Sequence, residues 1–168
     1  MKSSCVLALL LTVGCFPSDE TGMPMDSDDH SMNMDTGAEL DVSGCSFAEL
    51  RTEALASGTV VLAGLSLDDA TPMADILADP GAYEGSQLQV QGMVATVCTG
   101  NGCNVVLVDH EGGLIKLQTD EGAPGAPDLR DYTEVGHFGI GEGEFTNADD
   151  PLAIALEGAV FLATDCAQ

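Results

Sequence analysis

Two cysteines separated by four residues, Cys98 and Cys103, form a pair whose type and spacing could do chemistry. Such a pair can form a disulfide across a hairpin, act as a redox couple, or bind a metal. Thr99-Gly100-Asn101-Gly102 lies between them and supplies residues that accept the positive φ of a tight turn. Metal motifs usually add further ligands, and no basic residue stands nearby to favour the reactive thiolate. We expect a structural disulfide, with the redox pair and the metal site as alternatives.

A second group of candidate ligands precedes the cysteine pair in an acidic part of the chain. It consists of four methionines and one histidine: Met23, Met25, His30, Met32 and Met34. Thioether sulfur and imidazole nitrogen are soft or borderline ligands that suit copper. The alternative is that these residues occur by chance in a linker. Copper or other soft-metal handling is therefore an alternative function, with modest affinity because a disordered site must become ordered on binding.

The N-terminus has the features of an export signal. Lys2 provides a positive charge, and the apolar run that follows is too short to cross a bilayer as a helix. The stretch Leu-Thr-Val-Gly-Cys that ends at Cys15 resembles a bacterial lipobox, in which the cysteine carries the lipid. An ordinary signal peptide is the alternative. We predict a signal peptide over residues 1–14, lipidation of Cys15, and an exported lipoprotein held at a membrane in the periplasm or on the cell surface.

The charge of the chain limits its partners. The formal net charge is −24, from 28 acidic and 4 basic residues. Such a chain repels phosphate backbones and anionic lipids, so we expect no nucleic-acid partner and membrane contact through the lipid anchor alone. Residues 15–43 carry acidic side chains, no basic one and little apolar surface to bury, which predicts a disordered tether.

Four of the six cysteines follow the tether. An even number of cysteines in an exported domain indicates disulfides, because the compartment is oxidising. Cys45 opens the folded region and Cys166 nearly ends it, whereas Cys98 and Cys103 are neighbours. Of the three possible pairings, we favour Cys45 with Cys166 and Cys98 with Cys103.

The elements that must position these cysteines begin after residue 44. Ser46 and Glu49 form a capping-box pattern that predicts a helix over residues 46–57, and the aliphatic run 59–67 predicts a strand. Thr71, as N-cap, begins a second short helix with proline at its first position. Its inward-facing residues are expected to be Met73, Ile76 and Leu77.

Strand patterns dominate the rest of the chain. Five segments alternate or are rich in β-branched residues: 87–97, 104–109, 113–119, 135–145 and 154–164. Gly92 inside the first segment suggests a bulge or a sharp coil. The segments are too close together for crossover helices. We therefore predict a mainly β domain over residues 44–168, a small five-stranded OB-like barrel with one or two short helices.

About residues 65–120 resemble a known family, with the motif itself in residues 83–103. The match includes Tyr83, Gly85, Gly92, Cys98 and the Gly-Cys pair that ends the segment. It resembles an uncharacterised family of small exported bacterial OB-like domains with the pattern Y-x-G-x-x-V-x-V-x-G-x-V-x-x-V-C-x-x-x-G-C-W. This chain departs from the pattern with asparagine in place of the tryptophan and leucine in place of the first valine. The family has no established activity, so the resemblance implies the fold.

Other candidate ligands have simpler explanations. His110 is expected at a turn and His137 in a strand, and no third ligand can be assigned to them, so we expect solvated or packed histidines. The acidic pairs 68–69 and 149–150 lack the spacing of an EF-hand loop and are expected to be surface charge. The sequence contains no G-x-S-x-G, P-loop or H-E-x-x-H motif.

These patterns together predict a binding module without catalytic activity. We expect a lipid-anchored, monomeric protein of the bacterial cell envelope whose partner is an unknown protein or small molecule. The first alternative is soft-metal handling through the tether. The second alternative is a thiol–disulfide redox protein that uses Cys98 and Cys103.

Overall fold

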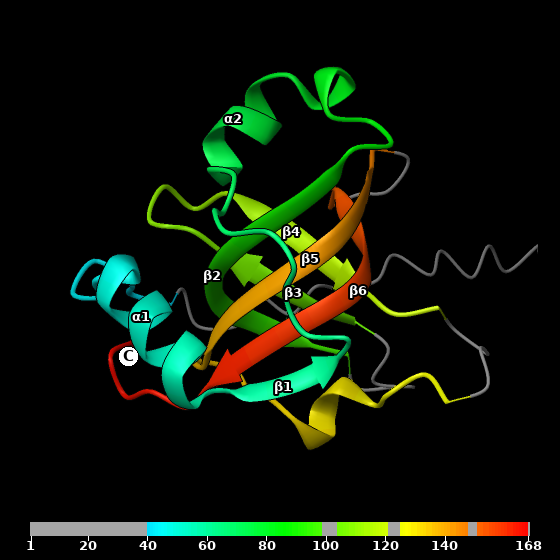
Figure 1. Cartoon of the computed structure of the whole chain (residues 1–168). Coiled ribbons are helices and arrows are strands. Elements are labelled where there is room, and N and C mark those ends of the chain that lie inside the picture. Colours follow the sequence, from blue (N-terminus) through cyan, green and yellow to red (C-terminus); the bar gives the residue numbers. More distant parts are fainter. Residues whose placement is uncertain (1–39, 99–103, 121–124, 148–150, 168) are drawn as a thin grey trace, which may run out of the picture. The chain divides into compact units, whose positions relative to one another are not determined.

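The structure is a computed structural model, and it describes residues 40–98, 104–120, 125–147 and 151–167 (Figure 1). Its helices and strands, in chain order, are α1 (Phe47–Ser57), β1 (Thr59–Leu62), α2 (Met73–Ala78), η1 (Pro80–Ala82), β2 (Gln87–Val97), β3 (Asn104–Val108), β4 (Leu114–Gln118), η2 (Leu129–Asp131), β5 (Phe138–Thr146) and β6 (Ala153–Leu162). No helix among the described residues is long and apolar enough to cross a membrane.

Strands β2 to β6 close into a five-stranded barrel. β2 pairs with β3, β3 with β4, β4 with β6, β6 with β5, and β5 again with β2. All these pairs are antiparallel except β4–β6, which is parallel. This order and closure define an OB-like Greek-key barrel, so the predicted fold class is confirmed. β1 pairs with β6 as an additional, sixth strand.

Helix α1 lies against the outer side of the barrel (Figure 1). It begins as the capping pattern predicts, because the Ser46 hydroxyl accepts the Glu49 N–H at 3.4 Å. Its buried residues Leu50 and Ala54 share one apolar cluster with residues of β2, β5 and β6. The strand residues in this cluster are Met93, Phe138, Ile140, Val160 and Leu162. Two adjacent turns of α1 therefore attach it to the sheet.

The second predicted helix forms, but two of its details were wrong. α2 begins at Met73 with Pro72 as N-cap and no side-chain cap. Thr71 instead donates its backbone N–H to the Gln89 carbonyl at 2.7 Å, because the chain is still extended beside β2 at this point. Met73 and Ile76 are buried as expected, whereas Leu77 is 37% exposed.

Short elements cover the two ends of the barrel. In Figure 1, α2 lies above the strands and η2 lies below them. Met73 and Ile76 of α2 and Leu129 of η2 all belong to the main core cluster, together with inward-facing residues of every strand. The barrel interior is therefore a packed core.

Glycine at alternate positions of β5 makes room for that core. Gly139 and Gly141 face inward, and a methyl group added at Gly141 would lie 2.5 Å from the Leu117 side chain. Leu117 and Phe161 fill the space that larger side chains on β5 would occupy. The side chains between these glycines point to the outer side of β5. There Ile140 packs in the apolar cluster beneath α1 and Glu142 binds the segment after β1.

The sequence suggests a bulge or a sharp coil at Gly92, and the irregularity of β2 begins two residues further along the strand. The pairing of β2 with β5 is continuous from Gln87 to Met93, and the register of β2 against β3 shifts between Val94 and Thr96. Gly92 has a different requirement, because a methyl group there would lie 2.6 Å from the Val108 carbonyl oxygen. Glycine at this position therefore permits the close approach of the β2 and β3 backbones.

Gly92→Ala is expected to lower the free energy of unfolding by about 1–3 kcal/mol, because the β2 and β3 backbones must separate. Urea unfolding measures this change. Gly44→Ala is the matched control, since a methyl group at Gly44 meets nothing within 4 Å. Equal stability of the Gly92→Ala and Gly44→Ala variants would contradict the packing explanation.

Candidate functional site

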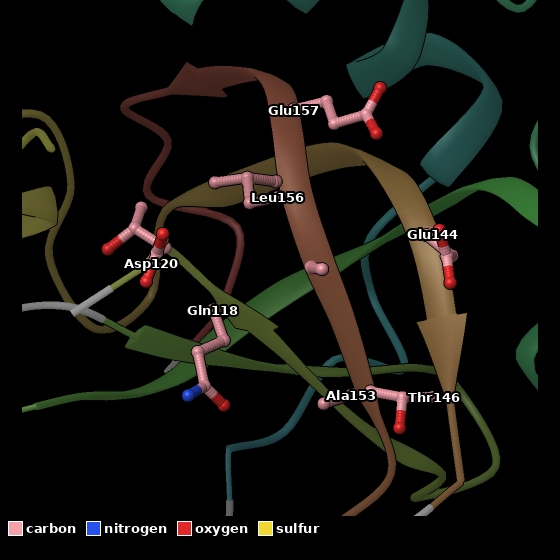
Figure 2. Close-up of a pocket in the computed structure, with 9 residues that line it drawn as sticks. Gln118, Asp120, Glu144, Thr146, Ala153, Leu156 and Glu157 are labelled. Carbon is pink, nitrogen blue, oxygen red and sulfur yellow. The ribbon is translucent and has the colours of Figure 1, made fainter. Parts of the chain in front are cut away.

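A groove on the outer side of the barrel is the candidate site (Figure 2). It crosses the ends of β4 and β5 and the first half of β6, and its volume is about 440 Å³. We call it the acidic groove, and its lining residues are Gln118, Thr119, Asp120, Glu144, Thr146, Ala153, Ala155, Leu156 and Glu157.

The strand register explains why this face is hollow. Ala155 on β6 lies between Gln118 on β4 and Glu144 on β5, and Ala153 pairs with Thr146 on β5. The central strand thus contributes methyl groups, while its two neighbours contribute longer side chains. A row of short side chains between longer ones leaves a groove along β6.

Carboxylates surround the acidic groove. Asp120 and Glu144 lie on either side of β6, and Glu157 lies further along β6 (Figure 2). Glu157 Oε1 accepts a hydrogen bond of 3.0 Å from the Gln87 side-chain amide, which orients this carboxylate. Lys116, which pairs with Ala153, contributes the one positive charge in β4, β5 and β6, and the three carboxylates of the groove outnumber it. The field of the groove therefore attracts cations and repels anions.

A buried carboxylate on β5 was missed by the sequence analysis. Glu142 is only 6% exposed, and it accepts hydrogen bonds from a segment that we call the strap, residues 63–72. Ser66 donates both its N–H, at 3.0 Å, and its hydroxyl, and Leu67 donates its N–H at 2.8 Å. The Gln89 side-chain amide donates a further bond of 3.1 Å. Glu142 therefore fastens the strap to the barrel wall.

The environment of Glu142 has opposing effects on its acidity. Burial raises the pKa of this carboxyl, whereas hydrogen bonds from the Ser66 hydroxyl, the Leu67 N–H, the Gln89 amide and the Ser66 N–H lower it. The hydrogen bonds prevail, so the pKa of Glu142 lies below its ordinary value of 4.5. Because its oxygens are buried and engaged, we assign Glu142 a structural role.

The disulfide between Cys45 and Cys166 is present, which confirms that predicted pairing. The two α-carbons are 5.5 Å apart, and 121 residues separate the cysteines in the sequence. Both cysteines pack with the cluster beneath α1. Val42 belongs to the same cluster, so the packed chain begins shortly before residue 44.

The second predicted disulfide falls at the edge of the described chain. Cys98 follows β2, and its N–H donates to the Asn104 carbonyl at 3.0 Å, so the predicted β2–β3 hairpin is formed. This register places Asn104, and not Cys103, directly opposite Cys98. Cys103 lies outside the described residues, so the Cys98–Cys103 bond stays a prediction.

The predicted lipidation site and the predicted metal ligands of the tether also lie outside the described residues. These are the lipidation site Cys15 and the soft-metal candidates Met23, Met25, His30, Met32 and Met34. The acidic pair 149–150 lies in another undescribed segment. Within the part of the chain that the structure describes, no three His, Cys, Asp or Glu residues form a group that could hold a metal.

The two described histidines make different local contacts. His110 lies at the β3–β4 turn, as expected, and stacks on Phe47 with ring centroids 3.8 Å apart. His137 precedes β5, so its expected place within a strand was wrong. Its Nδ1 accepts the Glu134 N–H at 3.2 Å, because the chain turns there before the strand begins.

The sequence predicted a longer first strand than the structure has. β1 ends at Leu62, whose φ is +59°, and Gly64 follows with a φ of +77°. These two residues turn the chain away from β6 and into the strap. Asp68 lies at the surface, as expected. Its backbone carbonyl accepts a hydrogen bond of 2.6 Å from the Arg51 guanidinium group.

No family model matches this chain, and no curated protein matches it. Among solved structures, it is similar to "OBody AM1L10 bound to hen egg-white lysozyme", at 19% identity over 60% of this chain and 100% of that one, with a TM-score of 0.48. A second, "OBody AM3L09 bound to hen egg-white lysozyme", has 22% identity, covers 59% and 99% of the two chains, and has a TM-score of 0.46.

A third similar structure is a chain of the S. pombe Stn1-ten1 complex. It has 12% identity and a TM-score of 0.40, and the match covers 46% of this chain and 59% of that one. All three similarities have TM-scores below 0.5, so the assignment of the OB-like fold depends on the strand order and the closure of the barrel. The resemblance of about residues 65–120 to a family of exported domains stays a prediction.

Proposed function

We propose that this protein is an exported, lipid-anchored binding module without catalytic activity, and that it binds a positively charged ligand in the acidic groove. The observation that carries the proposal is the groove itself, where Asp120, Glu144 and Glu157 surround a floor of alanine methyl groups. The lipid on Cys15 and the tether would hold the barrel at a membrane.

The chemistry of the acidic groove supports binding of an ammonium or guanidinium group. Carboxylates accept charge-assisted hydrogen bonds from such groups, and the Gln118 amide and Thr146 hydroxyl add neutral partners. Ala153 and Ala155 leave room for an aliphatic stem between the carboxylates. The net charge of −24 draws cations toward the barrel from a distance and repels anionic ligands.

Removing two groove carboxylates should weaken the binding of a cation. For the Glu144→Gln, Glu157→Gln double variant we expect the affinity for spermidine to fall about twofold to thirtyfold, since partly screened charge pairs contribute ~0.2–1 kcal/mol each. Isothermal titration calorimetry at low ionic strength measures this change. Added salt should weaken binding to the unaltered protein more than binding to the double variant.

A matched control separates the groove from the overall charge. The Glu53→Gln, Asp75→Asn variant loses the same two charges from exposed positions on α1 and α2. It should retain the spermidine affinity within about twofold, because these charges are distant and screened. An equal loss of affinity in both double variants would refute specific binding in the groove.

A further inference from the structure

The outer edge of β1 lacks the usual protection of an edge strand. Among the described residues, β1 pairs only with β6. Its sequence, Thr-Val-Val-Leu, contains no charge and no proline, although edge strands usually carry such residues to prevent pairing with another chain. Val60 is 60% exposed and Leu62 is 45% exposed. The strand thus presents an apolar edge to solvent.

The register shows which backbone groups this edge offers. Ala63 donates its N–H to the Glu157 carbonyl at 3.3 Å, and Val61 is paired with Ala159. Because hydrogen-bonding direction alternates along a strand, residues 59, 61 and 63 turn their groups toward β6. The N–H groups of Val60 and Leu62 therefore point to the unpaired edge.

The edge of β1 is separate from the acidic groove, although both involve β6. β6 pairs with β1 through residues 158–161 and with β4 through residues 153–155. Glu157 lies between these two stretches, and its carboxylate belongs to the groove while its carbonyl binds the residue that follows β1. The Glu157 carboxylate itself points away from β1, because it binds the Gln87 side chain of β2 on the β5 side of β6.

We propose that the edge of β1 accepts an extended segment of a partner protein as an added strand, with lysine or arginine alternating with apolar residues. The apolar side chains contact Val60 and Leu62, and the basic side chains complement the net negative charge of the chain. Charge complementarity argues against a second copy of this chain, because each copy has a net charge of −24. The partner's charge follows from the net charge of the chain, so the proposal goes beyond the proposed function and does not depend on the acidic groove.

The probe for this proposal is a capped synthetic peptide of alternating lysine and valine. Amide hydrogen exchange, measured by NMR, should show slower exchange at Val60 and Leu62 when the peptide is added to the full chain. Val60→Lys should weaken peptide binding about tenfold, because the new lysine repels the lysines of the peptide. A loss of about tenfold corresponds to the loss of one or two hydrogen bonds. Val60→Thr keeps a β-branched, uncharged side chain, so this variant should bind the peptide with an affinity within about twofold of that of the unaltered protein.

A second variant tests the backbone directly. Val60→Pro removes one edge N–H, so it should abolish the protection of Leu62 by the peptide. Both Val60→Lys and Val60→Pro are compared with the unaltered protein by circular dichroism, and Val60→Lys supplies the test if the proline variant unfolds. Spermidine binding should remain unchanged in Val60→Lys.

The outcomes separate strand addition from groove binding. Unaltered exchange at Val60 and Leu62 in the presence of saturating peptide would overturn strand addition, while retained spermidine binding would leave the acidic groove as a site. Protection of both amides together with absent spermidine binding would support the β1 proposal and refute the groove proposal.

Discussion

Loss of the Cys45–Cys166 disulfide is expected to lower the free energy of unfolding by about 2–5 kcal/mol. The bond joins the residue before the N-cap of α1 to a residue after β6, across 121 positions of sequence. A cross-link over so long a loop removes many conformations from the unfolded chain. The bond also fixes both ends of the folded region beside the cluster formed by α1, β5 and β6.

The Cys45→Ala, Cys166→Ala double variant and the unaltered protein should be compared by urea unfolding without reductant. The variant should unfold at a lower urea concentration. Added reductant should lower the urea midpoint of the unaltered protein, which has the Cys45–Cys166 bond to lose. The Cys98→Ser, Cys103→Ser variant is the control, because it keeps the long-range bond intact and leaves no free thiol from the predicted second pair. If the double variant and the unaltered protein have the same midpoint, the disulfide does not stabilise the fold as described.

Glu142→Gln is expected to destabilise the protein by about 2–4 kcal/mol, since hydrogen bonds to a charged group contribute ~1.5–3 kcal/mol each and the amide cannot accept all of them. An amide presents one oxygen and one NH₂ group to the donors of Ser66, Leu67 and Gln89. One N–H group of the strap or of Gln89 would therefore meet another donor in a buried position.

Glu142 also makes stability depend on pH in a defined direction. Its pKa in the folded protein lies below 4.5, so its contribution is fully present above about pH 4.5 and decreases as the pH falls through the folded-state pKa. The loss of stability between pH 5 and lower values should therefore be shallower in Glu142→Gln than in the unaltered protein. Chemical unfolding at a series of pH values measures both slopes.

The matched control for Glu142→Gln is Glu144→Gln, which changes an exposed glutamate on the same strand. This control should change the free energy of unfolding by no more than about 0.5 kcal/mol, as is usual for surface substitutions. Similar effects of the two substitutions would show that the strap contacts of Glu142 do not stabilise the fold.

Local signals predicted most of the fold. The Ser46 and Glu49 pattern placed α1, and alternation placed the five barrel strands, because each signal depends on neighbouring residues. Thr71 was wrong as an N-cap because pairing with Gln89 on β2 prevailed over the local preference for a cap. The expected strand 59–67 was too long because a turn at Leu62 directs the chain into the strap.

The acidic groove could not be predicted in the same way. It exists because the parallel pairing of β4 with β6 places Gln118 beside Ala155, and this contact joins distant parts of the sequence. Glu142 in Gly-Glu-Gly looked like one of many acidic residues, and its burial depends on a strap that crosses from β1 to α2 (Figure 1). Alternate glycines on β5 are the one sequence signal that could have indicated outward contacts of the side chains between them.

An NMR titration of the full chain with spermidine tests the central claim most directly. Saturable shifts should concentrate on the backbone amides of residues 118–120, 144–146 and 153–157, and Glu144→Gln with Glu157→Gln should reduce both the shifts and the affinity. Raising the salt concentration should weaken the binding, because the attraction is electrostatic. The absence of saturable shifts, or shifts confined to residues outside the acidic groove, would contradict the proposal that this face binds a positively charged ligand.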